Sequence, residues 1–293
     1  VQKGIEKVSK ILMPVLILLS LAMAIYALTL DGAMEGFIYY VKPNFSDFSM
    51  KTVVAAMGQL FYSMSLAMGI MITYGSYMGK QDDLEQSVRH VEVFDTLVAF
   101  LSGLMIVPAV YTFMGTEGMS AGPGLMFVSL PKIFEAMGAA GPVIGTIFFL
   151  MVSFAAVTSS VSVMESIVSN IIDRFHVSRK KGTVLVTIYA CIVGVIVCLG
   201  YNVLYFELKL PNGAVAQILD LMDYLSNNLL MPTVALLSCI LIGWVVKPQT
   251  IIDEVTIGGY KFGRKKLYIV MVKFVAPVLL AALLLQSLGV FSL

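Results

Sequence analysis

Gly58-Gln59-Leu60-Phe61-Tyr62-Ser63-Met64-Ser65-Leu66-Ala67-Met68-Gly69 places two hydroxyl groups and a tyrosine between two glycines, inside a charge-free run from Thr52 to Gly79. A run of this length can cross a bilayer as a helix. Glycines and hydroxyls at its centre predict that the helix is interrupted there. Membrane helices break only where protein or a water-filled cavity satisfies the freed backbone groups, so the interruption predicts a cavity.

An interrupted helix has the chemistry of half a binding site. Backbone N–H groups of the second half-helix would point at an anionic group, and carbonyls of the first half would hold a cation. A carboxylate substrate fits this arrangement. The same composition has a structural interpretation, in which the glycines allow close helix packing and the serines bond back to the preceding turn. A second interruption is expected at Ser226-Asn227-Asn228, which Pro232 follows.

The composition of the whole chain is that of a membrane protein. Of its 293 residues, 59% are hydrophobic and 13% are charged, and the mean hydropathy is +0.92. Continuous apolar runs favour helices over membrane-spanning strands, whose residues alternate. We therefore expect an all-α protein with one transmembrane domain over residues 1–293 and a helical outside loop at about 120–137. The seven predicted spans cover about 8–30, 52–79, 92–115, 138–172, 181–206, 214–246 and 267–291.

Positive charge marks cytoplasmic loops, so the lysines and arginines predict the orientation. With the N-terminus inside, the cytoplasmic segments hold 14 of these residues and the outside segments hold 4. The prediction is a multi-pass protein of the cell membrane with a cytoplasmic N-terminus and an outside C-terminus. The net charge of +1 gives no indication of nucleic-acid binding. The expected partner of the spans is the lipid bilayer that surrounds them.

The sequence gives no sign of an enzyme. It contains no phosphate-binding glycine loop, nucleophile elbow or paired catalytic carboxylate. Cys191, Cys198 and Cys239 lie in apolar runs, and His90 and His176 lie in or near cytoplasmic loops without metal-ligand spacing.

A hydroxyl-rich helix face suggests a cation site. Ala155, Thr158 and Ser159 lie at positions i, i+3 and i+4 of the predicted fourth span. Two hydroxyl oxygens and a carbonyl oxygen suit a hard monovalent cation, although such faces also serve helix packing. Ionisable residues at membrane depth are further candidates, namely Asp95, Glu165, Asp220 and Asp223, each with an alternative interpretation as an interfacial charge.

These motifs resemble the neurotransmitter:sodium symporter family. The likeness rests on Gly58 to Tyr77 and on Ala155-Ala156-Val157-Thr158-Ser159-Ser160-Val161-Ser162. It extends over nearly the whole chain, because Met13-Pro14 looks like part of the family's fifth helix and Gly122-Pro123-Gly124-Leu125 like its fourth outside loop. The resemblance implies the inverted-repeat fold of the bacterial leucine transporter, here partial, with seven spans corresponding to the fifth to eleventh helices.

The resemblance also implies roles for individual residues. Ser63 and Asp95 would contribute to one sodium site, and the carbonyl of Ala155 with the hydroxyls of Thr158 and Ser159 to a second. The residues expected to line the substrate pocket are Tyr62, Ser63, Ser65, Met68, Ser159 and Val163, and those expected at the gates are Gln59, Asp173 and Asp223.

Three departures from the family limit this transfer. The family commonly has Asn where Asp95 stands, and chloride-dependent members have a serine where this chain has Ala99. A resident carboxylate can supply the negative charge of chloride, so we expect sodium dependence without chloride dependence. The third departure is that the family's first four helices have no counterpart here. We expect them upstream in a longer protein, or supplied by a partner chain.

The resulting functional hypothesis is sodium-coupled symport of an amino acid into the cell by alternating access. The expected partners are then a small-molecule amino acid and the lipid bilayer. A hydrophobic amino acid is favoured because Met68 and Val163 leave the expected pocket apolar. Two alternatives stay open: a non-transporting membrane sensor or channel-like module, and a proton-coupled carrier of the same fold.

Overall fold

The computed structural model describes residues 2–46, 48–119, 124–211 and 213–290. The chain forms two compact units, Val1–Asp47 with Glu92–Val161, and Phe48–Val91 with Ser162–Leu293, which we call unit one and unit two. Helices α5 (Leu84–Met114) and α7 (Gly141–Phe175) each contribute residues to both units.

Unit one is a helical assembly around an apolar core. Its other elements are α1 (Gln2–Leu28), α2 (Ala33–Val41), the 3₁₀ turn η1 (Gly115–Gly118), the π-helical turn η2 (Leu125–Ser129), α6 (Leu130–Ala136) and the 3₁₀ turn η3 (Gly138–Ala140). The core takes side chains from four helices, among them Met23, Val110, Ile133 and Phe148. Gly36 brings α2 against α5, since a Cβ there would lie 2.7 Å from the Cα of Pro108.

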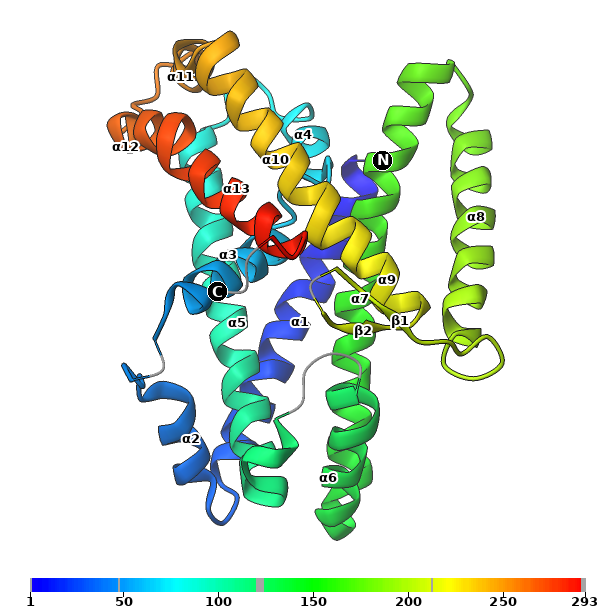
Figure 1. Ribbon diagram of the computed structural model, residues 1–293. Coiled ribbons are helices and arrows are strands. Elements are labelled where there is room, and N and C mark those ends of the chain that lie inside the picture. The colour runs from blue at the N-terminus through cyan, green and yellow to red at the C-terminus, as the bar shows by residue number, and fades with distance from the viewer. Residues whose placement is uncertain (1, 47, 120–123, 212, 291–293) are drawn as a thin grey trace. The chain divides into compact units, whose positions relative to one another are not determined.

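Unit two holds the remaining helices and a small hairpin. Its elements are α3 (Met50–Ser63), α4 (Ile70–Gly75), α8 (Arg179–Leu199), β1 (Leu208–Lys209), β2 (Val215–Ala216), α9 (Ile218–Asp223), η4 (Tyr224–Leu230), α10 (Met231–Ile240), η5 (Leu241–Val245), α11 (Pro248–Val255), α12 (Lys265–Val270), η6 (Met271–Val275) and α13 (Ala276–Ser287). Helices α10 and α13 pack side by side (Figure 1). The hydroxyl of Tyr224 donates to the carbonyl of Ser287 at 2.7 Å and joins the start of η4 to the end of α13.

The prediction of a helical membrane protein with an interrupted span is confirmed. Within the described residues, six helices are long and apolar enough to span a membrane: Ser9–Leu28, Leu84–Glu117, Gly138–Phe175, Arg179–Leu199, Ile218–Val245 and Lys265–Ser287. The seventh apolar stretch, expected at 52–79, is divided between α3 and α4. The break lies at residues 64–69, inside the stretch that predicted it.

The second expected interruption is wrong. The chain through Ser226-Asn227-Asn228 continues as the π-helical turn η4 and passes directly into α10. The hydroxyl of Ser226 is satisfied within the helix, where it donates to the carbonyl of Met222 at 2.8 Å. Pro232 lies in the first turn of α10. The hydrogen bonding changes there from π to α, so the N–H that proline lacks is not needed.

The outside helical loop predicted at about 120–137 contains η2 and α6. Of the motif Gly122-Pro123-Gly124-Leu125, the first two residues lie outside the described residues.

Candidate functional site

The break between α3 and α4 is built from unusual backbone. Ser65 has φ +53°, Ala67 has φ +61° and Gly69 has φ +78°. Left-handed backbone is unstrained only for glycine, and a non-glycine residue held there costs about 1–3 kcal/mol. Such strain persists only where the surroundings fix it, which is typical of ligand sites. Two strained residues within three positions therefore make this segment the first candidate for function.

The break leaves backbone donors available. The amides of Ser65 and Leu66 fold back on the carbonyls of Tyr62 at 3.1 Å and Phe61 at 3.0 Å, which closes the end of α3. In the part of the chain that the structure describes, the amides of Ala67 and Met68 donate to no backbone carbonyl. Unpaired donors at membrane depth are costly, so an anionic ligand that accepted from them would stabilise the break.

Four of the predicted substrate residues of unit two lie at the end of α3 or within the break. Tyr62 and Ser63 end α3 with exposed side chains, whereas Ser65 and Met68 within the break are half-buried. Val163 lies on α7 next to Ser162, whose hydroxyl accepts from Tyr74 Oη of α4 at 2.7 Å. The sixth predicted substrate residue, Ser159, belongs to unit one.

A polar stripe on α7 holds the second half-helix in place. Ser162, Glu165, Ser166 and Ser169 recur at helical spacing on one face. Their partners come from α4 and the residues just after it. Thr73 Oγ1 lies 3.5 Å from Ser166 Oγ, and the Tyr74 hydroxyl donates to Ser162 Oγ. The Tyr77 hydroxyl contacts Glu165 and lies 3.1 Å from Ser169 Oγ. The structure thus joins two segments that are 88 residues apart in the chain.

Glu165 is a buried member of this stripe. It is 5% exposed, accepts from the Tyr77 hydroxyl and forms an ion pair with Arg179, the first residue of α8. The structure therefore favours an internal ion pair over the alternative of an interfacial charge. Sequence reasoning missed this pairing, although the spacing of Ser162, Glu165, Ser166 and Ser169 was a signal that could have indicated a polar contact face.

In unit one, α7 presents the predicted sodium ligands. The hydroxyl of Thr158 donates to the carbonyl of Ala155 at 2.9 Å and contacts that of Phe154 at 3.1 Å. Both bonds place the Thr158 hydroxyl next to carbonyl oxygens of the same helix turn. Ser159 follows with an exposed side chain, and Asp95 is half-buried on α5. Among the described residues, no three His, Cys, Asp or Glu side chains form a metal cluster.

The remaining predicted residues are placed within their own units. Ser63 belongs to unit two and Asp95 to unit one, so the pairing of these two at one ion stays a prediction. Of the predicted gate residues, Asp223 accepts a hydrogen bond from Asn227 Nδ2 at 2.5 Å. Gln59 on α3 and Asp173 on α7 are exposed.

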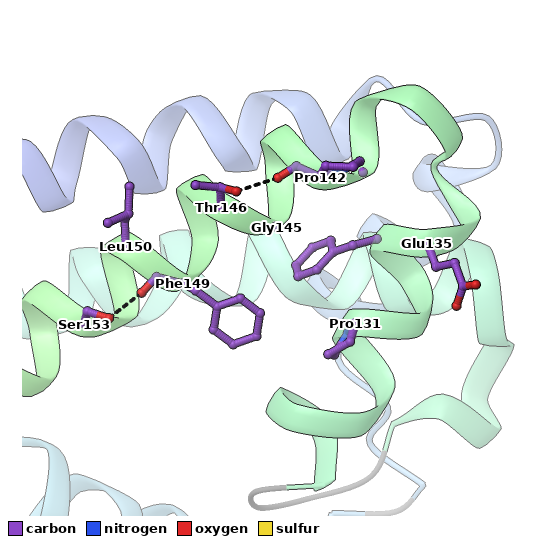
Figure 2. A pocket seen from close by; sticks show the side chains of 10 residues that line it. Pro131, Glu135, Pro142, Gly145, Thr146, Phe149, Leu150 and Ser153 are labelled. Carbon is purple, nitrogen blue, oxygen red and sulfur yellow. Dashed lines mark hydrogen bonds between the residues drawn. The ribbon is translucent and has the colours of Figure 1, made fainter.

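A large cavity of unit one is a separate feature (Figure 2). It encloses about 700 Å³ between α6 and the first half of α7 and is lined by Pro131, Phe134, Glu135, Gly141, Pro142, Gly145, Thr146, Phe149, Leu150 and Ser153. Its hydroxyls serve the helix itself, since Thr146 and Ser153 each donate to a carbonyl four residues earlier at 2.7 Å. None of the predicted ion or substrate residues lines it, and few polar groups converge there, unlike a typical ligand pocket.

Within unit two, a broken membrane helix and a polar stripe that anchors its second half are features typical of secondary transporters. The chain belongs to the sodium:neurotransmitter symporter family, whose sequence model matches residues 1–292. This is a family of symporters and not of enzymes.

Individual relatives agree with this assignment. The chain is 33% identical to the sodium-dependent transporter YhdH of Bacillus subtilis (strain 168), covering 100% of this chain and 63% of the relative. It is 32% identical to a sodium-dependent transporter of Haemophilus influenzae, covering 97% of this chain and 61% of the relative. The crystal structure of MhsT in complex with L-phenylalanine matches with a TM-score of 0.84 and 34% identity, over 97% of this chain and 63% of MhsT. The chain therefore has the fold class predicted for it, over less than two thirds of the length of these proteins.

Proposed function

We propose that the full-length protein couples the entry of sodium to the uptake of an amino acid by alternating access. The observation that carries this proposal is the break at residues 64–69, with strained backbone at Ser65 and Ala67 and unpaired amides at Ala67 and Met68. A substrate carboxylate is the group that these amides would hold. Family membership supports sodium as the coupling ion.

The predicted substrate residues favour a hydrophobic amino acid. Tyr62, Ser63, Ser65 and Ser159 offer hydroxyls for the polar end of the substrate, whereas Met68 and Val163 offer apolar contacts for its side chain. The match to MhsT, which was crystallised with L-phenylalanine, supports this class of substrate.

Two sodium sites are proposed. Ser63 and Asp95 contribute to one, and the carbonyl of Ala155 with the hydroxyls of Thr158 and Ser159 to the other. The hydrogen bond from Thr158 to Ala155 supports the second site, since it places two of the three oxygens next to each other. No chloride is required, because Asp95 supplies a negative charge and Ala99 lacks the hydroxyl of chloride-dependent relatives.

Gating and completion of the site involve more than this chain. Gln59 and Asp223 are proposed at the outer gate and Asp173 at the inner gate, in a membrane orientation with the N-terminus of this chain inside. Their partners, and the other half of each ion site, are expected from helices upstream in the same protein or from a partner chain.

The second sodium site can be tested by removing its hydroxyls. Replacing Thr158 and Ser159 by Ala in the full-length protein should abolish sodium stimulation of amino-acid uptake in proteoliposomes. The matched control is Ser160→Ala, because Ser160 is the next residue and its hydroxyl donates to its own helix at the Ala156 carbonyl, at 2.7 Å. Sodium stimulation that survives the double substitution would contradict the assignment.

The two alternatives give different results in the same assay. A sensor or channel-like module would bind the amino acid without sodium-driven accumulation. A proton-coupled carrier would accumulate it in response to a pH gradient with sodium absent.

A further inference from the structure

Two π-helical turns of unit two pack against each other at one glycine. The turns are η5 and η6, and Gly243 lies buried between them. A Cβ at Gly243 would lie 3.3 Å from the carbonyl oxygen of Val272 and 3.5 Å from the Cα of Lys273. Only a glycine permits so close an approach of the two backbones without displacement. Because π-turns are rare and concentrate at functional sites, their pairing here calls for a functional explanation.

Lys273 is a charged residue inside a membrane helix. It lies eight positions after Lys265, the start of α12, which is about 12 Å along the helix axis. Its ammonium lies 5.7 Å from the ring centroid of Trp244, and the indole N–H of Trp244 contacts the Lys273 carbonyl at 3.3 Å. Within the described part of the chain, no carboxylate lies within ion-pairing distance of this ammonium. An intramembrane charge without a counter-ion is costly unless a ligand supplies one.

A second lysine stands at the end of the neighbouring span in strained backbone. Lys247 has φ +72° and ψ +141°, a region that non-glycine residues rarely occupy. It follows the end of the membrane span at Val245 and precedes Pro248, which opens α11. The strain therefore falls at the point where the chain leaves the bilayer.

The two lysines line one cavity. It encloses about 300 Å³, and its walls include Trp244, Lys247, Gln249, Ile252, Ile269 and Lys273. The cavity thus combines two positive charges with an indole and apolar isoleucine walls. It reaches from Lys247, just after the end of the span 218–245, to Lys273, inside the span 265–287. The Lys247 end is where lipid headgroups are expected.

We propose that this cavity binds the phosphate headgroup of an anionic phospholipid. The ammonium groups of Lys247 and Lys273 would neutralise the phosphate, and Ile252 and Ile269 would contact the glycerol and the first acyl carbons. Basic pockets between membrane helices are known to bind anionic headgroups, and tryptophan favours this interfacial depth. The assignment requires only that the helices span a membrane, so it does not depend on the proposed transport activity.

Native mass spectrometry of the full-length protein in mixed micelles tests the proposal. Phosphatidylglycerol is compared with phosphatidylcholine of the same acyl chains. The wild type should retain one more phosphatidylglycerol than phosphatidylcholine. Lys247→Gln combined with Lys273→Gln should weaken phosphatidylglycerol binding roughly thirtyfold, because each interfacial lysine contributes about a fivefold gain.

The control variant is Lys180→Gln with Lys181→Gln, which removes the same charge from exposed positions at the start of α8. It should leave the retained lipid in place. Equal retention of the two lipids, or equal losses in the two double variants, would overturn the proposal. Displacement of phosphatidylglycerol by an equal concentration of inorganic phosphate would assign the site to a soluble anion and would also overturn it.

If the double variant does not fold, Lys247→Gln alone provides the test, because this side chain is exposed. It should weaken phosphatidylglycerol binding roughly fivefold, and unchanged binding would overturn the proposal.

Discussion

At the residue scale, the break depends on Ser65 and Ala67, two non-glycine residues at positive φ. Ala67→Gly should stabilise the full-length protein by about 1 kcal/mol, since glycine adopts this backbone without steric cost. Ala67→Val should destabilise it by about 1–2 kcal/mol, because a β-branched side chain tolerates positive φ least. Thermal unfolding in detergent measures both changes.

The same substitution in a regular helix gives the matched comparison. Ala56 lies in the middle of α3, where Ala56→Gly should destabilise the protein by about 1 kcal/mol. If Ala56→Gly and Ala67→Gly change the stability of the protein in the same direction, the backbone at Ala67 is not left-handed in solution.

A second prediction for single residues concerns the ion pair between the buried Glu165 and the partly exposed Arg179. Arg179→Gln leaves the Glu165 carboxylate buried without its counter-charge. The cost should be about 1–3 kcal/mol, below the value for a fully buried pair, because the Arg179 side chain is 40% exposed.

A double-mutant cycle measures the interaction free energy between the two side chains apart from the effect of each single substitution. Glu165→Gln combined with Arg179→Gln should be more stable than Arg179→Gln alone, since no unpaired charge remains. Additive losses across the cycle would mean that the two side chains do not interact.

At the element scale, Gly69 joins the break to α4 and has no room for a side chain. Its φ is +78°, and a Cβ there would lie 2.9 Å from Ser166 Oγ on α7. Gly69→Ala should therefore lower thermal stability by about 1–2 kcal/mol and reduce uptake. Adding Ser166→Ala should restore part of the loss, because it removes the close contact and leaves the backbone strain.

Gly75 is the control for this prediction. It ends α4, and a Cβ added to it would have no atom within 4 Å, so Gly75→Ala should be neutral or stabilising. Equal effects of Gly69→Ala and Gly75→Ala would contradict the described geometry of the break.

Sequence reasoning reached the helices and the break for clear physical reasons. About 20 apolar residues have few alternatives to a membrane helix, and hydroxyls between Gly58 and Gly69 marked the interruption. It failed at Ser226-Asn227-Asn228, because a π-turn shifts hydrogen bonds by one residue and satisfies polar side chains without a break. It also missed the contact between Tyr77 and Glu165, which are 88 positions apart. A polar stripe on a helix indicates that this face contacts another segment, but it does not identify that segment.

For the whole molecule, we expect that transport does not need chloride. Replacing external chloride by gluconate should leave sodium-driven uptake by the full-length protein unchanged, because Asp95 supplies the negative charge. Asp95→Asn should reduce uptake in both anions or make it respond to chloride. Loss of wild-type uptake in gluconate would contradict the prediction.

We propose that the broken helix and the hydroxyl face on α7 belong to a sodium-coupled amino-acid transporter. The most direct measurement is uptake of radiolabelled L-phenylalanine by the full-length protein in proteoliposomes, with an inward sodium gradient, with an equal potassium gradient, and with sodium equal on both sides. Transient accumulation above the external concentration is expected only with the sodium gradient. Accumulation that is the same under all three conditions, or binding of the amino acid without any uptake, would contradict it.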